Sequence, residues 1–502
     1  MTMTRKSRRD FIRQLAGTVC AGGATALLPQ LGMLGTALAQ APAGSVPGYR
    51  ALVCVYFAGG NDSWNMLMPG DQARHDVYLA SRGGIYNATT NAAGLGIPRA
   101  GQAGGALAIT DSATSQAYGI HPSMAGLRTI YNANRLAFLA NVGTLRRPIT
   151  KAEYNANASL RPPQLYSHND QENQWQFGRA GNAPTGWGGQ VADRVRGGNL
   201  YQPLSPCISI AGSNRFQVGD PTFPYQMGTG GVANLSGVCN PGSTCTGFNS
   251  QRTAALDLLL NQAYGDALTA EYARTLKRGR ELQDIVKTSL DGPNGSIATP
   301  NFPANNSLAD QLRMVARMIR VSRETALGIQ HARQIYYVRV GGFDLHDGLM
   351  STGNNGHAAV LGRVSAAVAW FWAALADIGA QNEVTTFSMS EFARTLNSNG
   401  NGSDHAWGGV QFAMGGAVQG GRLYGAWPDQ TLNGPVSFSR GQTIPAIGVE
   451  QMGATLAQWM GVTNASDLNT IFPNLPNFPT ANLGFTPSAT PSRTRASGSI
   501  TS

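Results

Sequence analysis

The chain has 502 residues, of which 13% are charged and 42% hydrophobic, and its formal net charge at pH 7 is +10. These values exclude a coiled coil and a small disulfide-stapled protein, and they predict a folded body with a sizeable core. Outside the first forty residues no apolar run is long enough to span a bilayer, so we expect no integral membrane segment in the mature chain.

The first 39 residues predict a twin-arginine signal peptide. Residues 8–9 are the arginine pair, a mildly apolar stretch follows, and residues 37–39 (Ala-Leu-Ala) give the small-residue pattern of a cleavage site. The alternative is a basic terminus ahead of an ordinary helix. We expect the signal to be removed and the mature protein to be periplasmic or secreted.

Removing the signal lowers the formal net charge to +6, because it holds five basic residues and one acidic residue. The remaining basic residues form no dense run, whereas nucleic-acid binding needs a concentrated basic patch. The charge therefore predicts no nucleic-acid partner. A mild preference for anionic substrates and simple solubility are both compatible with it.

Four cysteines remain after the signal, and Cys54 lies in a segment that reads as a buried strand. Cys239 and Cys245 are spaced to close a small disulfide in an oxidising compartment. Because Cys207 is also present, the sequence leaves the disulfide pairing open.

Strand-like and helical segments alternate along the whole chain. The expected strands are 51–57, 136–142, 207–211, 334–340 and 383–389, and the expected helices follow His121-Pro122 and cover 251–290, 308–333, 357–378 and 449–460. This alternation predicts an α/β fold, a three-layer sandwich with a mainly parallel central sheet. We expect a single α/β domain at 40–480, a helical insertion around 250–330 and a flexible tail at 481–502.

Five candidate metal ligands follow predicted strands, where such folds place their ligand sites. Asp62 comes after the first strand, Asp344 and His346 after the fourth, and Asp404 and His405 in the loop after the fifth. Carboxylate oxygens with imidazole nitrogens suit Zn, Mn or Fe. Each pair taken alone also fits a turn or a surface pair, so the prediction of a divalent-metal site rests on the set.

Three further residues have two interpretations each. Ser167 is either a helix N-cap, with Asp170 completing the capping pattern, or a nucleophile that a metal would activate. Glu391 is a candidate metal ligand and Arg394 a candidate clamp for an anion, and a structural ion pair between them is the alternative. His168 directly follows Ser167. The four remaining histidines are interpreted as structural, and they are His75, His121, His331 and His357.

The chain resembles a bacterial family, domain of unknown function 1501, over nearly all of its mature length. The matching segments are GGNDSWNMLMP (59–69), HPSMAGLRTIYNANRLAFLANVG (121–143), SHNDQENQWQ (167–176), GWGGQVAD (186–193), GGFDLH (341–346), SEFART (390–395), GSDHAWGG (402–409) and MGGAVQGGRLYG (414–425). Twin-arginine signals are common in this family. It looks like a distant branch of the alkaline phosphatase and sulfatase superfamily, whose α/β sandwich binds one or two divalent metals at strand ends.

The resemblance implies roles for the candidate residues. Asp62 would match the first metal-binding Asp and Ser167 the region of the nucleophile. One metal pair would be Asp344 with His346, and the other Asp404 with His405.

These observations lead to two hypotheses about function. The first is an exported hydrolase of phosphate or sulfate esters that uses Zn, Mn, Ca or Mg, with Ser167 or water as nucleophile and Arg394 holding a small anionic ester. The alternative is a non-catalytic exported binding or assembly protein on the same scaffold, with an exported protein as its partner. It is motivated by the lack of a histidine after His405, where the superfamily usually supplies one.

Overall fold

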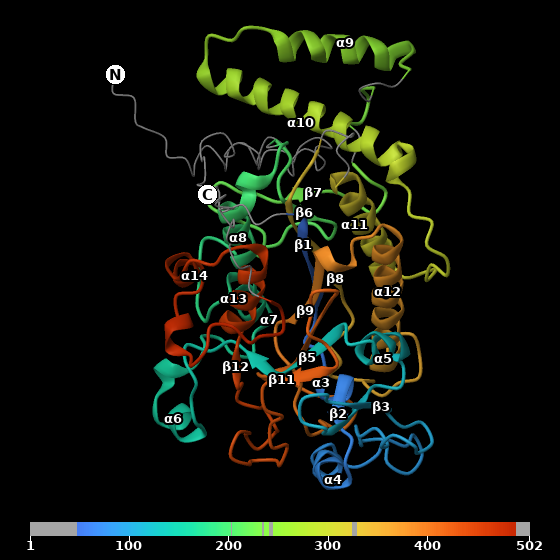
Figure 1. Ribbon diagram of the computed structural model, residues 1–502, viewed down its shortest axis with the longest axis vertical. Coiled ribbons are helices and arrows are strands. Elements are labelled where there is room, and N and C mark those ends of the chain that lie inside the picture. The colour runs from blue at the N-terminus through green and yellow to red at the C-terminus, as the bar shows by residue number, and fades with distance from the viewer. Residues whose placement is uncertain (1–47, 202, 233–234, 240–243, 324–328, 488–502) are drawn as a thin grey trace, which may run out of the picture.

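The computed structural model describes residues 48–201, 203–232, 235–239, 244–323 and 329–487 (Figure 1). The predicted signal peptide, 1–39, lies outside the described residues, as does most of the predicted tail. The part of the tail that is described, residues 481–487, packs on the body: Phe485 is fully buried and its carbonyl accepts a hydrogen bond from the backbone of Gln419. Phe485 therefore anchors this segment to the body.

A mainly parallel sheet of nine described strands forms the centre of the molecule. Eight strands lie in the order β11-β5-β10-β9-β1-β8-β6-β7, and β12 pairs with β5. Only β10, among the described strands of this sheet, runs antiparallel to its neighbours. The strands are β1 (Arg50–Phe57), β5 (Leu136–Gly143), β6 (Cys207–Ser209), β7 (Tyr225–Gln226), β8 (Arg333–Val340), β9 (Val384–Ser390), β10 (Gly409–Gly415), β11 (Arg422–Tyr424) and β12 (Ile447–Gly448).

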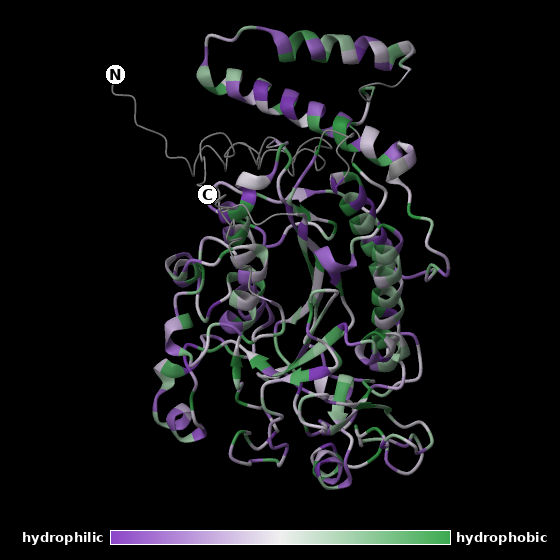
Figure 2. Ribbon diagram, in the orientation of Figure 1, coloured by the Kyte–Doolittle hydropathy of each residue, from purple (hydrophilic) through white to green (hydrophobic). Residues whose placement is uncertain are grey.

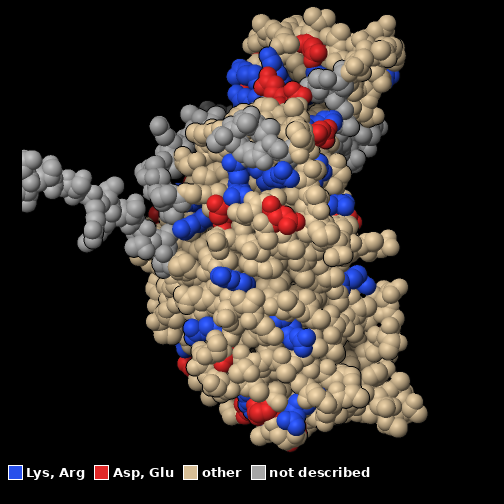
Figure 3. Space-filling model, turned by 45° about the vertical axis from the view of Figure 1, so that its right-hand side comes forward, with Lys and Arg blue, Asp and Glu red and all other residues tan. Residues whose placement is uncertain are grey.

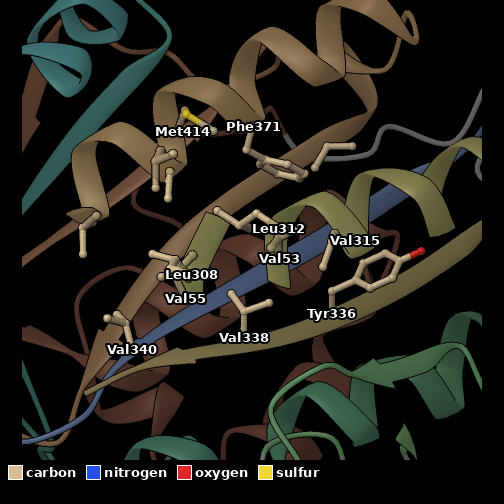
Figure 4. Packing of buried hydrophobic residues seen from close by; sticks show 14 of the residues in the cluster. Val53, Val55, Leu308, Leu312, Val315, Tyr336, Val338, Val340, Phe371 and Met414 are labelled. Carbon is tan, nitrogen blue, oxygen red and sulfur yellow. The ribbon is translucent and has the colours of Figure 1, made fainter. Parts of the chain in front are cut away.

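The strand β1 shows why the sequence has a continuous apolar run here. Its side chains alternate between two hydrophobic clusters, with Val53 and Val55 in one and Cys54 and Tyr56 in the other. A strand that is covered on both faces needs apolar residues at every position. Figure 4 shows the first cluster, where β1 and β8 meet side chains of α11.

Helices cover both faces of the sheet (Figure 1). One face carries α5 (Ala125–Asn132), α11 (Ser307–Arg323) and α12 (His357–Asp377), and the other carries α7 (His168–Phe177), α8 (Trp187–Val195), α13 (Val449–Met460) and α14 (Ala465–Ile471). The structure thus confirms a mixed α/β fold with a large, mainly parallel sheet, and it is compatible with the predicted three layers. In the described part, α12 is the one helix long and apolar enough to cross a membrane, and it packs in the core against α11 and α5.

Several helix boundaries differ from the sequence prediction. The helix expected at 251–290 is two helices, α9 (Gly247–Asn261) and α10 (Ala267–Asp291), and Asp266 caps the second by accepting a hydrogen bond from the backbone of Thr269. The helix expected to reach 333 is described as far as Arg323, and residues 329–332 are not helical. The helix expected after His121-Pro122 begins at Ala125.

The remaining elements lie outside the main sheet. A small antiparallel sheet has the order β2-β4-β3, and the other helices are short. They are β2 (Leu67–Pro69), β3 (Leu107–Thr110), β4 (Ala117–Ile120), α3 (Ser63–Met66), α4 (Gln72–Ser81) and α6 (Lys151–Ala156). Cys239 and Cys245 form a disulfide, while Cys54 and Cys207 are free and buried.

Candidate metal centre

One edge of the main sheet gathers most of the predicted site residues. The carboxyl ends of β1, β8 and β9 lie at this edge because these strands are parallel. The residues that precede β10 lie there too, because β10 runs in the opposite direction. Backbone hydrogen bonds between Thr395 and Asp404 and between Ala393 and Ala406 hold the two ends of the connecting loop together.

The loop after β1 approaches the loop after β8 so closely that glycine is required. Gly59 has φ of +116°, and a Cβ atom built on it would lie 2.4 Å from the backbone nitrogen of Asp344. Only glycine fits both the backbone angle and the space. This explains the Gly59-Gly60 pair directly after the strand, and it fixes the position of Asp344.

Three histidines surround the carboxylate of Asp344. The Nε2 atoms of His346 and His405 lie 3.2 Å and 3.5 Å from its Oδ1 atom, and the Nε2 atom of His168 lies 3.5 Å from its Oδ2 atom. Half of the Asp344 side chain is exposed, so the cluster opens to solvent. His346 and His405 were expected here, whereas no role was predicted for His168.

The outer nitrogen of each imidazole faces a hydrogen-bond acceptor. These contacts join His168 Nδ1 to Glu391 Oε1 (2.9 Å), His346 Nδ1 to Asp404 Oδ1 (3.0 Å) and His405 Nδ1 to the carbonyl oxygen of Tyr166 (2.8 Å). A neutral imidazole that donates from Nδ1 keeps its lone pair on Nε2. In the neutral rings all three lone pairs are therefore directed toward Asp344, in the arrangement that outer acceptors give to metal-binding histidines.

The inner nitrogens of His346 and His405 lie 2.9 Å apart. Two lone pairs at this distance repel each other unless a proton or a metal ion lies between them. The ligand atoms of His168, Asp344 and His405 also lie within 4.8 Å of one another. A set of imidazole nitrogens with one carboxylate has the chemistry to hold Zn, Mn or Fe.

Glu391 lies behind His168 rather than in the centre of the cluster. It is buried, and its carboxylate accepts hydrogen bonds from the backbone of Gly59 (2.7 Å) and from the hydroxyls of Tyr56 and Ser390 (3.3 Å each). The hydrogen bond to Glu391 raises the pKa of His168, and this outweighs the lowering caused by partial burial. Glu391 thus fixes the ring and tautomer of His168.

Asp404 holds His346 in the same way as Glu391 holds His168, through a hydrogen bond to the Nδ1 atom. Partial burial alone raises the pKa of Asp404, but hydrogen bonds from Asn399, His346 and Arg440 lower it to about 2. The Arg440 guanidinium lies 2.7 Å from the second carboxylate oxygen. Asp404 is therefore an ionised acceptor that orients His346.

Arg394 does not face the solvent, as an anion clamp would. Its side chain is fully buried and donates to the carbonyls of Gly60 (2.9 Å) and Ser403 (2.8 Å), and it also forms an ion pair with Asp344. That pair lowers the pKa of Asp344, against the effect of partial burial. Because its donors are committed to the protein, Arg394 positions the loops and Asp344 instead of binding a substrate anion.

Asp62 is not part of the cluster. It is buried in an ion pair with Arg82, and the side chains are 1% and 0% exposed. Arg82 also donates to the carbonyls of Thr395 and Leu396 (3.0 Å each), underneath the loop that carries His405. A guanidinium supplies the positive charge beside Asp62, where the resemblance implied a metal ion.

Ser167 occupies the N-cap position of α7, but its hydroxyl does not bond to the helix backbone. It donates instead to Asp170 Oδ2 over 2.7 Å. Its neighbours Tyr166 and His168 both contact the cluster. The four histidines interpreted as structural are all buried: His75, His121, His331 and His357. His331 lies just before β8, whereas it had been expected in a helix.

The fold and this edge define a mixed α/β protein with a histidine-carboxylate centre at the carboxyl ends of its parallel strands. Residues 49–440 match the model of a family described as "Protein of unknown function (DUF1501)", and the chain belongs to that family. The matched region contains every residue of the cluster. Searches of curated proteins and of solved structures found no match.

Proposed function

We propose that this chain is a metal-dependent hydrolase of phosphate or sulfate esters, in which His168, His346, His405 and Asp344 bind a divalent ion. The observation that carries the proposal is the orientation of the three imidazoles. Each one donates outward from Nδ1 and turns its Nε2 atom toward the same carboxylate. Outer acceptors orient metal-binding histidines in this way, and this likeness supports the proposal.

The charges around the centre favour an anionic substrate once a divalent ion is bound. Asp344 pairs with Arg394 and Asp404 with Arg440, while Glu391 contacts the His168 ring, which leaves one net negative charge when the ring is neutral. A divalent ion reverses the sign and, when bound, lowers the pKa of a coordinated water. Since Arg394 is buried, we assign the contact with the substrate anion to Arg440, which is 40% exposed.

We infer that a metal-activated water is the nucleophile, in preference to Ser167. The hydroxyl of Ser167 is already hydrogen-bonded to Asp170, and it stands at the start of a helix whose first residue is His168. Its role is then to order the first turn of α7 and so to place His168. Glu391 and Asp404 hold their histidines in the productive tautomer throughout the reaction.

The relationship to alkaline phosphatases and sulfatases and the export of the protein are further parts of this proposal. Residues 8–9 and 37–39 support export, and the disulfide Cys239–Cys245 fits an oxidising compartment. Replacing both arginines at 8–9 by lysine should leave the protein in the cytoplasm with its signal uncleaved. Cell fractionation checks this, and normal export of the variant would contradict it.

The proposal is tested by elemental analysis of protein purified without chelators, together with assays on p-nitrophenyl phosphate and p-nitrophenyl sulfate. We expect about one divalent ion per chain, and its loss in Asp344→Ala. The matched control is Asp347→Ala, which removes an exposed carboxylate of the same loop that contacts Asn401 and not the histidines. This control should keep both the metal and the activity.

Two results would contradict the proposal. Absence of metal from the unaltered chain, even after incubation with Zn or Mn, would remove the metal centre. Bound metal without turnover of either ester would favour the alternative, a non-catalytic exported binding or assembly protein.

A further inference from the structure

The helices α9 and α10 form a hairpin that stands away from the rest of the molecule (Figure 1). The second half of α10 is attached to the body, where Leu282, Val286 and Leu290 belong to the core. By contrast, α9, all of whose residues are described, buries no side chain. It contacts α10 through the ion pair of Asp257 with Arg280 and the hydrogen bond of Asn261 with Lys277. It also contacts the disulfide segment before it, because the hydroxyl of Thr253 accepts a hydrogen bond from the backbone of Cys239.

Exposed apolar side chains are concentrated on this hairpin. The described part of the chain exposes nine large hydrophobic side chains, and five of them lie between residues 248 and 272. We call these five the hairpin patch: Phe248, Leu258, Leu259, Leu268 and Tyr272. Their exposed fractions run from 47% for Tyr272 to 74% for Leu258, and Figure 2 shows hydrophobic residues along both helices.

A patch of this kind marks a surface that another molecule covers. Scattered exposed leucines are normal, but a concentration of them on one element is typical of an interaction site. An isolated helix of 15 residues is also only marginally stable in water, so α9 gains from being covered. Leu268 and Tyr272 are four residues apart and share one face of α10.

The charge of the hairpin indicates what covers it. Residues 247–291 hold six basic and six acidic side chains, while the chain without the predicted signal has a formal net charge of +6. Figure 3 shows basic and acidic side chains next to each other at the hairpin end of the molecule. A neutral surface has no net attraction for an anionic membrane, which recruits polybasic segments. For a second copy of this basic chain, however, the neutral hairpin is the region that avoids repulsion.

We propose that the hairpin patch is the interface through which two copies of this chain form a dimer. Two-fold symmetry brings the same surface of each copy together, so it needs a surface that is complementary to itself in charge. A hairpin with equal numbers of both signs meets that need. Two such hairpins build a four-helix bundle, a common way to bury two amphipathic helix pairs.

The test is sedimentation equilibrium of the purified chain between 1 and about 100 μM, with the double variant Leu258→Glu/Leu268→Glu. We expect the unaltered chain to be a dimer and the variant to dissociate at least about 30-fold more readily. The matched control is Leu200→Glu, because Leu200 is 71% exposed and lies off the hairpin. This control should remain a dimer, and both variants should still unfold cooperatively on heating, which shows that the dissociated chain stays folded.

Three outcomes would overturn the proposal. A monomer at every concentration would show that copies of the chain do not cover the patch. A dimer that survives the double variant would place the interface elsewhere. A monomer that binds vesicles of phosphatidylglycerol and phosphatidylethanolamine, and loses this binding in the double variant, would assign the patch to a membrane surface.

Discussion

Two aspartate–arginine pairs lie near the same edge of the sheet and have opposite environments. Asp62 and Arg82 are both buried, and one carboxylate oxygen of Asp62 has no hydrogen-bond partner among the described residues. Asp344 is half exposed although its partner Arg394 is buried, and its carboxylate faces three imidazoles. The same two residue types thus produce a closed internal pair in one place and an open ligand site in the other.

This difference shows what makes a carboxylate available to a ligand. Both aspartates follow a buried strand and both have a cation beside them, so neither feature separates them. The separating feature is the presence of three imidazole Nε2 atoms on the open side of Asp344. Glu450 adds a third case, a buried carboxylate that is held by the backbone and side-chain amides of Asn474.

The largest effect on stability should come from Asp62→Ala. It leaves the buried Arg82 guanidinium without its counter-charge, which typically costs about 3–5 kcal/mol in free energy of unfolding. Asp344→Ala should cost only about 1 kcal/mol, because the pair is half exposed and Arg394 keeps its carbonyl partners. Urea denaturation of both variants gives the comparison.

Metal content should respond in the reverse order. Folded Asp62→Ala should retain its metal, and Asp344→Ala should lose it. Equal destabilisation by the two variants, or metal loss from folded Asp62→Ala, would break the distinction between the closed and the open pair.

Glu450→Gln should stabilise the protein in a pH-dependent way. Burial raises the pKa of Glu450 from 4.5 to about 7, despite the hydrogen bonds from Asn474. The native state therefore keeps a proton that the unfolded state releases between pH 4.5 and 7, and stability falls as the pH rises through this window. Glutamine cannot ionise, so we expect the variant to match the native chain near pH 4 and to exceed it by about 2–3 kcal/mol near pH 8.

Thermal unfolding of both proteins at pH 4, 6 and 8 measures this difference. A constant difference in Tm across the three values would show that Glu450 does not ionise in this range. That result would mean that Glu450 behaves like Asp62, as a buried carboxylate whose charge is compensated by its neighbours.

Glu391→Gln should weaken metal binding by about 10–100-fold while leaving the ligands in place. In the native chain the charged carboxylate of Glu391 accepts hydrogen bonds from His168 and from the backbone of Gly59. The neutral amide of glutamine is a weaker acceptor, so the orientation of His168 is less well fixed. Competition with a metal-binding dye gives the affinity. Unchanged affinity would mean that His168 does not contribute a ligand and that Glu391 only supports the loop after β1.

The smallest effect is expected from Ser167→Ala. If a metal-bound water is the nucleophile, turnover of the aryl esters should fall less than about tenfold, in line with the loss of one ordering hydrogen bond. Loss of more than about a thousandfold, with metal content unchanged, would instead assign the nucleophile to Ser167.

The parts of the fold that depend on local pattern could be predicted from the sequence. Residues 51–57 were expected to form a buried strand and do so within β1, and the helix expected at 449–460 matches α13. Strand β10 was missed. Its residues form a strand by pairing with β5 and β9, and this pairing is a property of the tertiary structure. The break between α9 and α10 was also missed, although Gly265 and Asp266 are the residues that would signal it.

The candidate site was predicted in part, for a similar reason. Asp344, His346, Asp404 and His405 each stand next to a strand, so rules about strand ends find them. His168 comes from the start of a helix that the fold brings to this edge, and only its neighbour Ser167 had drawn attention to the segment. Nothing in the sequence near Asp62 indicates that Arg82 lies against it, because burial and pairing are properties of the tertiary structure.

The reversed direction of β10 has a consequence for how the centre forms during folding. Since β10 returns beside β9, Glu391, Asp404 and His405 belong to one short stretch of chain whose contacts are local. The contacts with Asp344 and with His168 close much longer loops, and long loops close late. The β9–β10 unit with His405 should therefore form before Asp344, His346 and His168 reach it, and the capacity to bind a ligand should appear only at the end of folding.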